Sequence, residues 1–177
     1  MSNSEHAKIY DAGVEAWNIW RKENPDEIPD LAGEQFSYKE LNGIDLSGMD
    51  LSYEDLSSAI LVGADFTGAE LDHTDLSDAD LTNARFHDAN ASCINLWGTD
   101  LTGADFKGAN LEYASLKETL MSGVNLEGAN LEGAYFLDAD GLSVGQLTKA
   151  KTLAGVIELD ALLLKDLQEQ VPYLFKV

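Results

Sequence analysis

A large apolar side chain returns at every fifth position between Phe36 and Phe136, and only Ala91 in this series is small. An alanine commonly precedes each member by two residues, so each five-residue unit supplies one large and one small apolar group. A helix would spread a period of five around its circumference, and a flat strand would place successive members on opposite faces. A coil with a corner every five residues keeps all of them inside.

The positions between the apolar residues carry Gly, Asp, Asn, Ser and Thr, which favour turns. If each unit forms one side of a square, four units close one turn and the large residues fall into four columns. One column contains Phe66, Phe86 and Phe106, whose rings would stack between coils about 4.8 Å apart. Another column contains Ala91, whose missing volume Ile94 would fill from a neighbouring inward position.

The repeats resemble those of the pentapeptide-repeat family, as in GADFTGAEL, GADFKGANL and GVNLEGANLEGAYF. The resemblance covers about residues 31 to 140, and the flanking segments VEAWNIWRKENP and GLSVGQLTKAKTLAGV are also similar to the family. It implies an all-β solenoid, a right-handed quadrilateral β-helix of about five coils with helical N- and C-terminal caps. The family implies a fold rather than a function.

Three segments are expected: an N-terminal helical cap at 1–30, the pentapeptide-repeat β-helix at 31–140, and a C-terminal helical segment at 141–177. Open ends of a β-helix invite association, so repeat proteins need caps. Residues 10–21 have the spacing of one amphipathic helix, which Pro25 would stop. The apolar helix expected from Leu159 to Val171 would either cap the last coil or pair two subunits.

The chain carries a formal net charge of −21, which bears on its partners. Such a charge repels nucleic acid and anionic membranes, so direct binding to either is not expected. The acid either keeps the rod soluble or attracts a basic protein. Residues 1–6 lack the apolar region of a signal peptide, and no apolar run is long enough to span a membrane. We therefore expect a soluble protein in the cytoplasm whose partner is another protein.

No pattern in the sequence indicates catalysis. A solenoid packed to its axis lacks the concave site that an enzyme needs. The sequence also has no glycine-rich phosphate loop, no Cys-x-x-Cys and no nucleophile elbow. We expect neither an enzyme nor a bound cofactor.

One column carries large side chains at the turn position two residues after the apolar centre. Tyr53, His73, Cys93 and Tyr113 are each twenty residues apart and should form a stripe, with Trp97 close beyond Cys93. Exposed aromatic groups of this kind are typical of protein-binding hot spots. The alternative is that these residues only stack for stability. A metal held by His73 and Cys93 would lack two further ligands, so no metal site is expected.

A second candidate surface is acidic. Carboxylates stand just before the apolar centres on all four expected sides: Asp45, Asp50, Asp55, Asp65, Glu70, Asp75, Asp80, Asp100 and Asp105. Members of the family that protect DNA gyrase resemble B-DNA in width and charge, which implies a DNA-mimic alternative for this chain. The sequence therefore leaves two functions open: a protein-interaction module that uses the aromatic stripe, and a modulator or protector of DNA gyrase or topoisomerase that uses the acidic faces.

Overall fold

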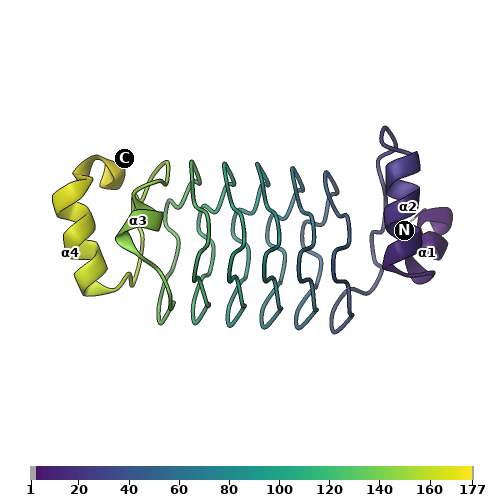
Figure 1. Cartoon of the computed structure of the whole chain (residues 1–177), viewed down its shortest axis with the longest axis horizontal. Helices are drawn as coiled ribbons and strands as arrows, with labels where there is room; N and C mark the ends of the chain where they lie inside the picture. The colour runs from purple at the N-terminus through teal and green to yellow at the C-terminus, as the bar shows by residue number, and fades with distance from the viewer. Residues whose placement is uncertain (1–2, 177) are drawn as a thin grey trace.

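The computed structural model describes residues 3–176 as a straight stack of coils with a helical cap at each end (Figure 1). Helices α1 (Ser4–Asp11) and α2 (Val14–Glu23) cover the N-terminal end. At the other end, α3 (Val144–Leu147) is followed by α4 (Ala161–Gln170) and the 3-10 helix η1 (Pro172–Phe175). None of the helices in the described residues is long and apolar enough to cross a membrane.

Parallel β-bridges join residues that are twenty apart throughout the repeats. One ladder begins with the pair Glu40 and Ile60 and reaches the pair Leu120 and Asp140. An offset of twenty with a five-residue repeat gives each coil four sides. The chain is therefore a β-helix solenoid with helical caps, as the sequence predicts.

Each corner is a β-turn that starts at the large apolar residue. At one corner the amide of Ala64 donates to the carbonyl of Leu61 at 3.0 Å, and Gly63 between them has φ +68°. A positive φ at the third residue is the geometry of type II turns, which explains why glycine is common there. The aspartate before the apolar residue also stabilises the turn: Asp65 accepts the backbone N–H of Thr67 at 3.0 Å.

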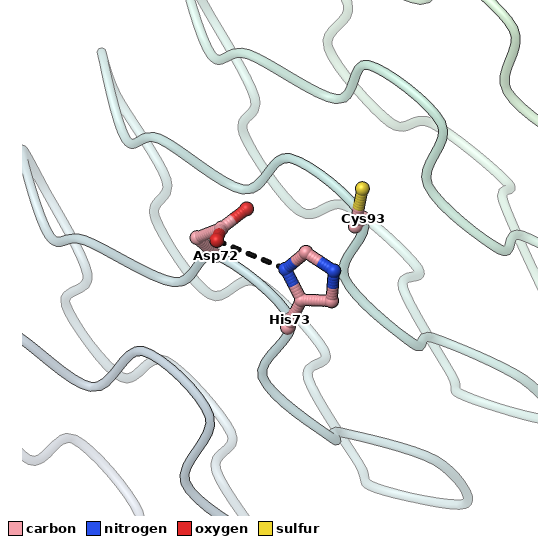
Figure 2. Close-up of side chains that lie close together, drawn as sticks. All are labelled: Asp72, His73 and Cys93. Atoms are coloured by element: carbon pink, nitrogen blue, oxygen red, sulfur yellow. Dashed lines mark hydrogen bonds and ion pairs between the residues drawn. The ribbon is translucent and has the colours of Figure 1, made fainter.

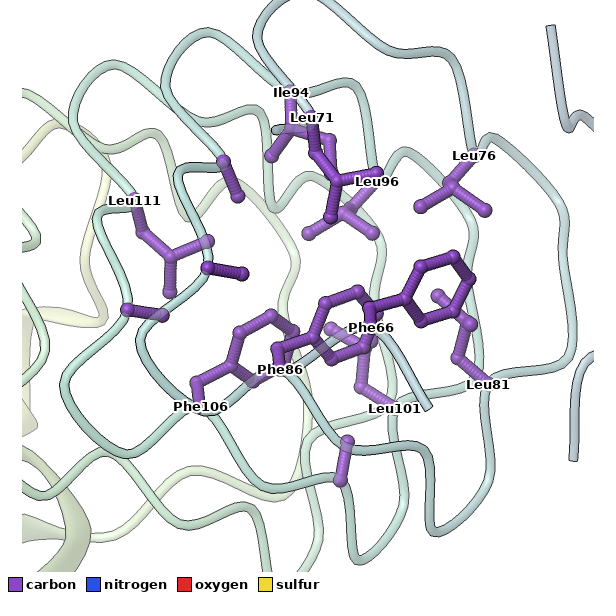
Figure 3. Packing of buried hydrophobic residues seen from close by; sticks show 14 of the residues in the cluster. Phe66, Leu71, Leu76, Leu81, Phe86, Ile94, Leu96, Leu101, Phe106 and Leu111 are labelled. Carbon is purple, nitrogen blue, oxygen red and sulfur yellow. The ribbon is translucent and has the colours of Figure 1, made fainter. Parts of the chain in front are cut away.

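The core lies along the axis of the stack. The rings of Phe66 and Phe86 stack at 4.8 Å between centroids, and those of Phe86 and Phe106 at 4.4 Å, both with planes 5° apart (Figure 3). The predicted phenylalanine column is therefore confirmed. Ala91 and Ile94 are both fully buried, so the smaller column member leaves no exposed gap.

The N-terminal cap differs from the single helix that the spacing predicts. Helix α1 ends at Asp11 and α2 starts at Val14, because Gly13 has φ +104°, which a helix cannot contain. The end of α2 at Glu23, ahead of Pro25, agrees with the expected stop.

Side chains of α2 bind the open edge of the first coil. The indole of Trp17 donates to the carbonyl of Asp45 at 2.7 Å, and the amide of Asn18 donates to the carbonyl of Gly43 at 2.8 Å. Asn18 also accepts the N–H of Asp45 at 2.9 Å, while Arg21 donates to another carbonyl of the same coil. The helix thus satisfies edge groups that would otherwise be free to pair with another chain.

The C-terminal ladder continues past the expected boundary at residue 140. Thr152 pairs with Asn130 and Ile157 pairs with Tyr135, an offset of twenty-two rather than twenty, because α3 lies within this last turn. Helix α4 starts at Ala161 instead of Leu159. Its N-cap Asp160 accepts the amides of the helix's first turn.

Candidate functional site

The four predicted stripe residues occupy one turn position on successive coils. Tyr53, His73, Cys93 and Tyr113 have φ between +54° and +64°. Each of their amides donates to a carbonyl of the next coil, as in the 3.1 Å bond from His73 to the carbonyl of Ser92. The backbone therefore holds all four positions in a single column.

Aromatic side chains in this column lean over the next coil. The rings of Tyr53 and His73 stack with centroids 5.0 Å apart and planes 13° apart. The ring of Tyr113 covers Gly133, where an added Cβ would collide with it. Tyr53 is 73% exposed and Tyr113 is 60% exposed, so both rings keep one open face.

Trp97 lies on a different column from the stripe. It is the first residue after the centre Leu96, whereas the stripe residues are second after their centres. Its indole donates to Glu118 of the next coil, and this bond, followed by one from Lys117, lowers the pKa of that carboxyl. Trp97 is 40% exposed and is held on the surface by this contact.

Beside His73 the structure gathers a polar cluster that sequence reasoning missed (Figure 2). Oδ2 of Asp72 lies 2.9 Å from Nδ1 of His73, and the hydroxyl of Ser92 donates to Oδ1 of Asp72 at 2.6 Å. Hydrogen bonds from Ser92, His73 and Tyr53 hold the pKa of Asp72 below its usual value. Positions 72 and 92 are twenty residues apart, so the period of the coils could have predicted this contact.

The cluster adds a third potential metal-binding group to the pair considered from the sequence. A carboxylate oxygen of Asp72, a ring nitrogen of His73 and the sulfur of Cys93 lie within 4.8 Å of one another. Sequence reasoning paired only His73 with Cys93, because it compared residues at one turn position. The immediate neighbour Asp72 supplies a third donor.

Another exposed tyrosine was also missed. Tyr38 is 78% exposed and has φ +61°, so it takes the turn position of the stripe residues on a different column. Its place two residues after the centre Phe36 could have identified it.

The predicted acidic residues form ladders on all four sides. Each is a bridging residue, and four pairs of them face one another on adjoining coils: Asp45 and Asp65, Asp50 and Glu70, Asp55 and Asp75, Asp80 and Asp100. Asp105 instead lies between Arg85 and Asn125. Further along one ladder the acids give way to amides, where Asn110 donates to Asn90 at 3.1 Å.

Two of these carboxylates have lowered pKa values. Burial alone raises the pKa of Asp45, but hydrogen bonds from Ser47 and the charge of Arg21 outweigh it. Burial likewise raises the pKa of Asp105, and contacts led by the hydrogen bond from His87 reverse that effect. Both carboxyl groups are therefore held in the charged form by local partners.

An apolar groove of about 510 Å³ lies between α1 and α2, away from both candidate surfaces. Ile9, Ala12, Ala16 and Ile19 contribute to its lining. The sequence analysis considered only the aromatic face of these helices and did not predict the groove. The helical spacing of its small and branched residues was the available signal.

Comparison with known proteins gives the family. A family model described as pentapeptide repeats matches eight copies over residues 40–78, 79–117 and 119–141. The chain belongs to the pentapeptide-repeat family. Among curated proteins, no sequence matches this pentapeptide-repeat chain significantly.

Solved structures of other pentapeptide-repeat proteins are similar to it. One, from the thylakoid lumen of Arabidopsis thaliana, is 31% identical, with 71% of this chain and 83% of that chain covered and a TM-score of 0.35. A trypsin-treated form of QnrB1, a plasmid-mediated fluoroquinolone resistance protein, is 20% identical, with 78% and 90% covered and a TM-score of 0.33. HetL, involved in heterocyst differentiation regulation in the cyanobacterium Nostoc sp. strain PCC 7120, is 23% identical, with 73% and 90% covered and a TM-score of 0.21. The family assignment rests on the repeat match rather than on these superpositions.

Proposed function

We propose that this pentapeptide-repeat protein is a non-enzymatic interaction module that presents its aromatic column to another protein. The observation that supports the proposal is the exposure of Tyr53 and Tyr113 on a backbone tied to the next coil at each step. Aromatic side chains on a rigid surface supply large contact areas at a small entropic cost.

The contacts within the column limit the freedom of these rings before a partner arrives. Tyr53 is stacked on His73 and bonded to Asp72, while Tyr113 rests on Gly133. A partner that covered the open faces would gain apolar burial without having to order mobile side chains. The coils themselves are not expected to change shape on binding.

The test is affinity capture from a lysate of the source organism with a Tyr53→Asn/Tyr113→Asn double variant. Asparagine already occupies the same turn position at Asn83, with φ +58°, so the coil should remain intact. The expected result is a protein that the wild-type chain retains at high salt and the double variant loses.

Tyr38→Asn is the matched control, because Tyr38 is an equally exposed tyrosine at the same turn position outside the column. It should retain the captured protein. Equal capture by the double variant would reject the aromatic column as the binding surface and leave it a purely stabilising stack.

The acidic ladders support a second proposal, a DNA-mimic modulator of gyrase or topoisomerase. Carboxylates such as Asp50 and Glu70 repeat on adjoining coils, which places negative charge at regular steps along a rod. The family resemblance includes members that protect DNA gyrase, and the structural neighbour QnrB1 is described as a plasmid-mediated fluoroquinolone resistance protein. Binding through these ladders should weaken steeply as salt is added.

A gyrase supercoiling assay with purified protein tests this alternative directly. Asp50→Asn/Glu70→Gln removes two facing charges and keeps the side-chain shapes. The alternative predicts an effect on gyrase that this variant reduces and Tyr53→Asn/Tyr113→Asn does not. An absence of any effect at low salt would reject it.

A further inference from the structure

We propose that Asp72, His73 and Cys93 form an exchangeable zinc site on the side of the β-helix. Their donor atoms, an oxygen, a nitrogen and a sulfur, lie within 4.8 Å of one another (Figure 2). Among the described residues, no other group of three potential metal ligands is as close. This inference goes beyond the proposed interaction function and does not depend on it.

The distances require only a small closure of the side chains. Zinc binds oxygen and nitrogen at about 2.0 to 2.2 Å and sulfur at about 2.3 Å, so donors around a tetrahedral ion lie roughly 3.3 to 3.8 Å apart. Oδ2 of Asp72 and Nδ1 of His73 are 2.9 Å apart and must separate slightly, whereas no separation exceeds this range by more than about 1 Å. Rotation of the Asp72 and Cys93 side chains can provide that movement while the coils stay fixed.

The surroundings orient the ligands in the way metal sites require. The hydroxyl of Ser92 donates to Asp72, and the ring of Tyr53 stacks on the imidazole of His73. The hydrogen bond between the amide of His73 and the carbonyl of Ser92 ties the two coils together at this point. Removal of a hydrogen bond to a metal-binding side chain commonly weakens metal affinity by about 10- to 100-fold, so the bond from Ser92 to Asp72 should strengthen binding.

The donor set selects the class of metal. One thiolate and one imidazole favour a borderline ion such as zinc over magnesium or calcium, which prefer oxygen alone. The His73 side chain is 50% exposed, so water can fill the fourth position. Three protein ligands with an open position make an exchangeable site rather than a closed structural one.

The experiment is titration of the full-length protein, without an affinity tag, with Co²⁺ as a spectroscopic substitute for Zn²⁺ in excess Mg²⁺. Magnesium occupies the surface carboxylates, and Cys93 is the single cysteine of the chain, so a thiolate-to-cobalt absorption band reports on this site alone. We expect one cobalt per chain, and Zn²⁺ should displace it. Zn²⁺ should also slow alkylation of Cys93.

Each variant of the three donor residues introduces a residue type that the chain already carries at an equivalent turn position. Cys93→Ser should abolish the band, and Ser58 shows that serine is accepted at φ +56°. Asp72→Asn and His73→Asn should each raise the cobalt dissociation constant by at least about tenfold. His87→Gln is the matched control, because His87 also pairs with an aspartate, Asp105, but lies outside the three-donor cluster, and it should leave binding unchanged.

Two results would overturn the proposal. Cobalt bound without a thiolate band would show that only surface carboxylates hold it. A band that persists at the same affinity in both Asp72→Asn and His73→Asn would show a thiol acting alone.

Discussion

The three stacked phenylalanines show how one residue type serves several coils at once. Phe86 contacts Phe66 on one side and Phe106 on the other with nearly parallel planes, and all three rings are fully buried. The spacing between rings is set by the coil rise, so a flat ring fills the axis without a gap. Loss of the central ring therefore opens a cavity that neither neighbour can fill by rotation.

We expect Phe86→Ala to lower the free energy of unfolding by about 3 to 5 kcal/mol, the range for removal of a buried aromatic ring. Phe86→Leu, which matches the residue found at other centres, should cost about 1.5 kcal/mol or less. Urea denaturation followed by circular dichroism measures both values. Equal losses for the two variants would contradict this expectation and show that the apolar volume of leucine cannot replace the stacked ring.

Among the elements, α2 contributes several side chains that complete hydrogen bonds of the β-helix, while Gln146 of α3 does so at the other end. Trp17 and Asn18 lie on the face of α2 that meets the first coil, where they bind carbonyls and an amide of its edge. The cap is thus more than an apolar lid, because its polar groups match the positions of the edge groups.

Trp17→Phe should destabilise the protein by about 1 to 3 kcal/mol, because it keeps a buried ring but leaves the carbonyl of Asp45 without the indole donor. Equilibrium unfolding measures the loss, and hydrogen exchange should locate it in the first coil. Ile19→Ala, on the half-exposed face of the same helix, should cost much less. A similar cost for both variants would contradict the role given to the indole.

The junction between cap and coil should also depend on pH. The pKa of Asp45 lies below its ordinary value of 3.8 in the folded protein, so its contribution to stability is present above that value and lost as pH falls through the lower, folded value. Asp45→Asn should therefore destabilise the protein at neutral pH, with the difference from wild type disappearing in acid.

Unfolding in urea at several pH values measures that difference. Asp50→Asn provides the control, because Asp50 has the same place in its turn, while Arg21 lies beside Asp45. A wild-type advantage over Asp45→Asn that stays constant into acid would show that Arg21 and Ser47 do not stabilise the charged form.

On the scale of the whole molecule, the twenty-residue offset is the condition that keeps the columns aligned. Deletion of residues 96–115 removes one complete turn and returns every later residue to its original column. Deletion of residues 106–115 removes half a turn and places later units on the opposite side. We expect the first variant to unfold cooperatively at a lower temperature than wild type, and the second to lose cooperative unfolding.

Thermal circular dichroism distinguishes these outcomes. The longer deletion removes more buried side chains, so a simple count of lost contacts would make it the worse of the two. Greater stability of the half-turn deletion would therefore reject alignment of columns as the controlling factor.

The sequence was sufficient to predict the coil because its period excludes a helix and a flat strand, and residue size alone identified the phenylalanine column. It did not predict the break at Gly13, since the apolar spacing on either side remains helical. It placed the stripe residues in one column but missed Asp72. The lean of side chains toward the next coil, which brings Asp72 to Ser92 and Cys93, depends on turn geometry that a repeat pattern does not contain.

The uneven distribution of charge along the ladders gives the rod a direction as well as a shape. The acids Asp50 and Glu70 are continued on the same ladder by the neutral amides of Asn90, Asn110 and Asn130. This ladder is therefore more negative near α2 than near the C-terminal cap. A cationic partner would attract the end near α2 during diffusion, so the two molecules would be oriented before their side chains come into contact.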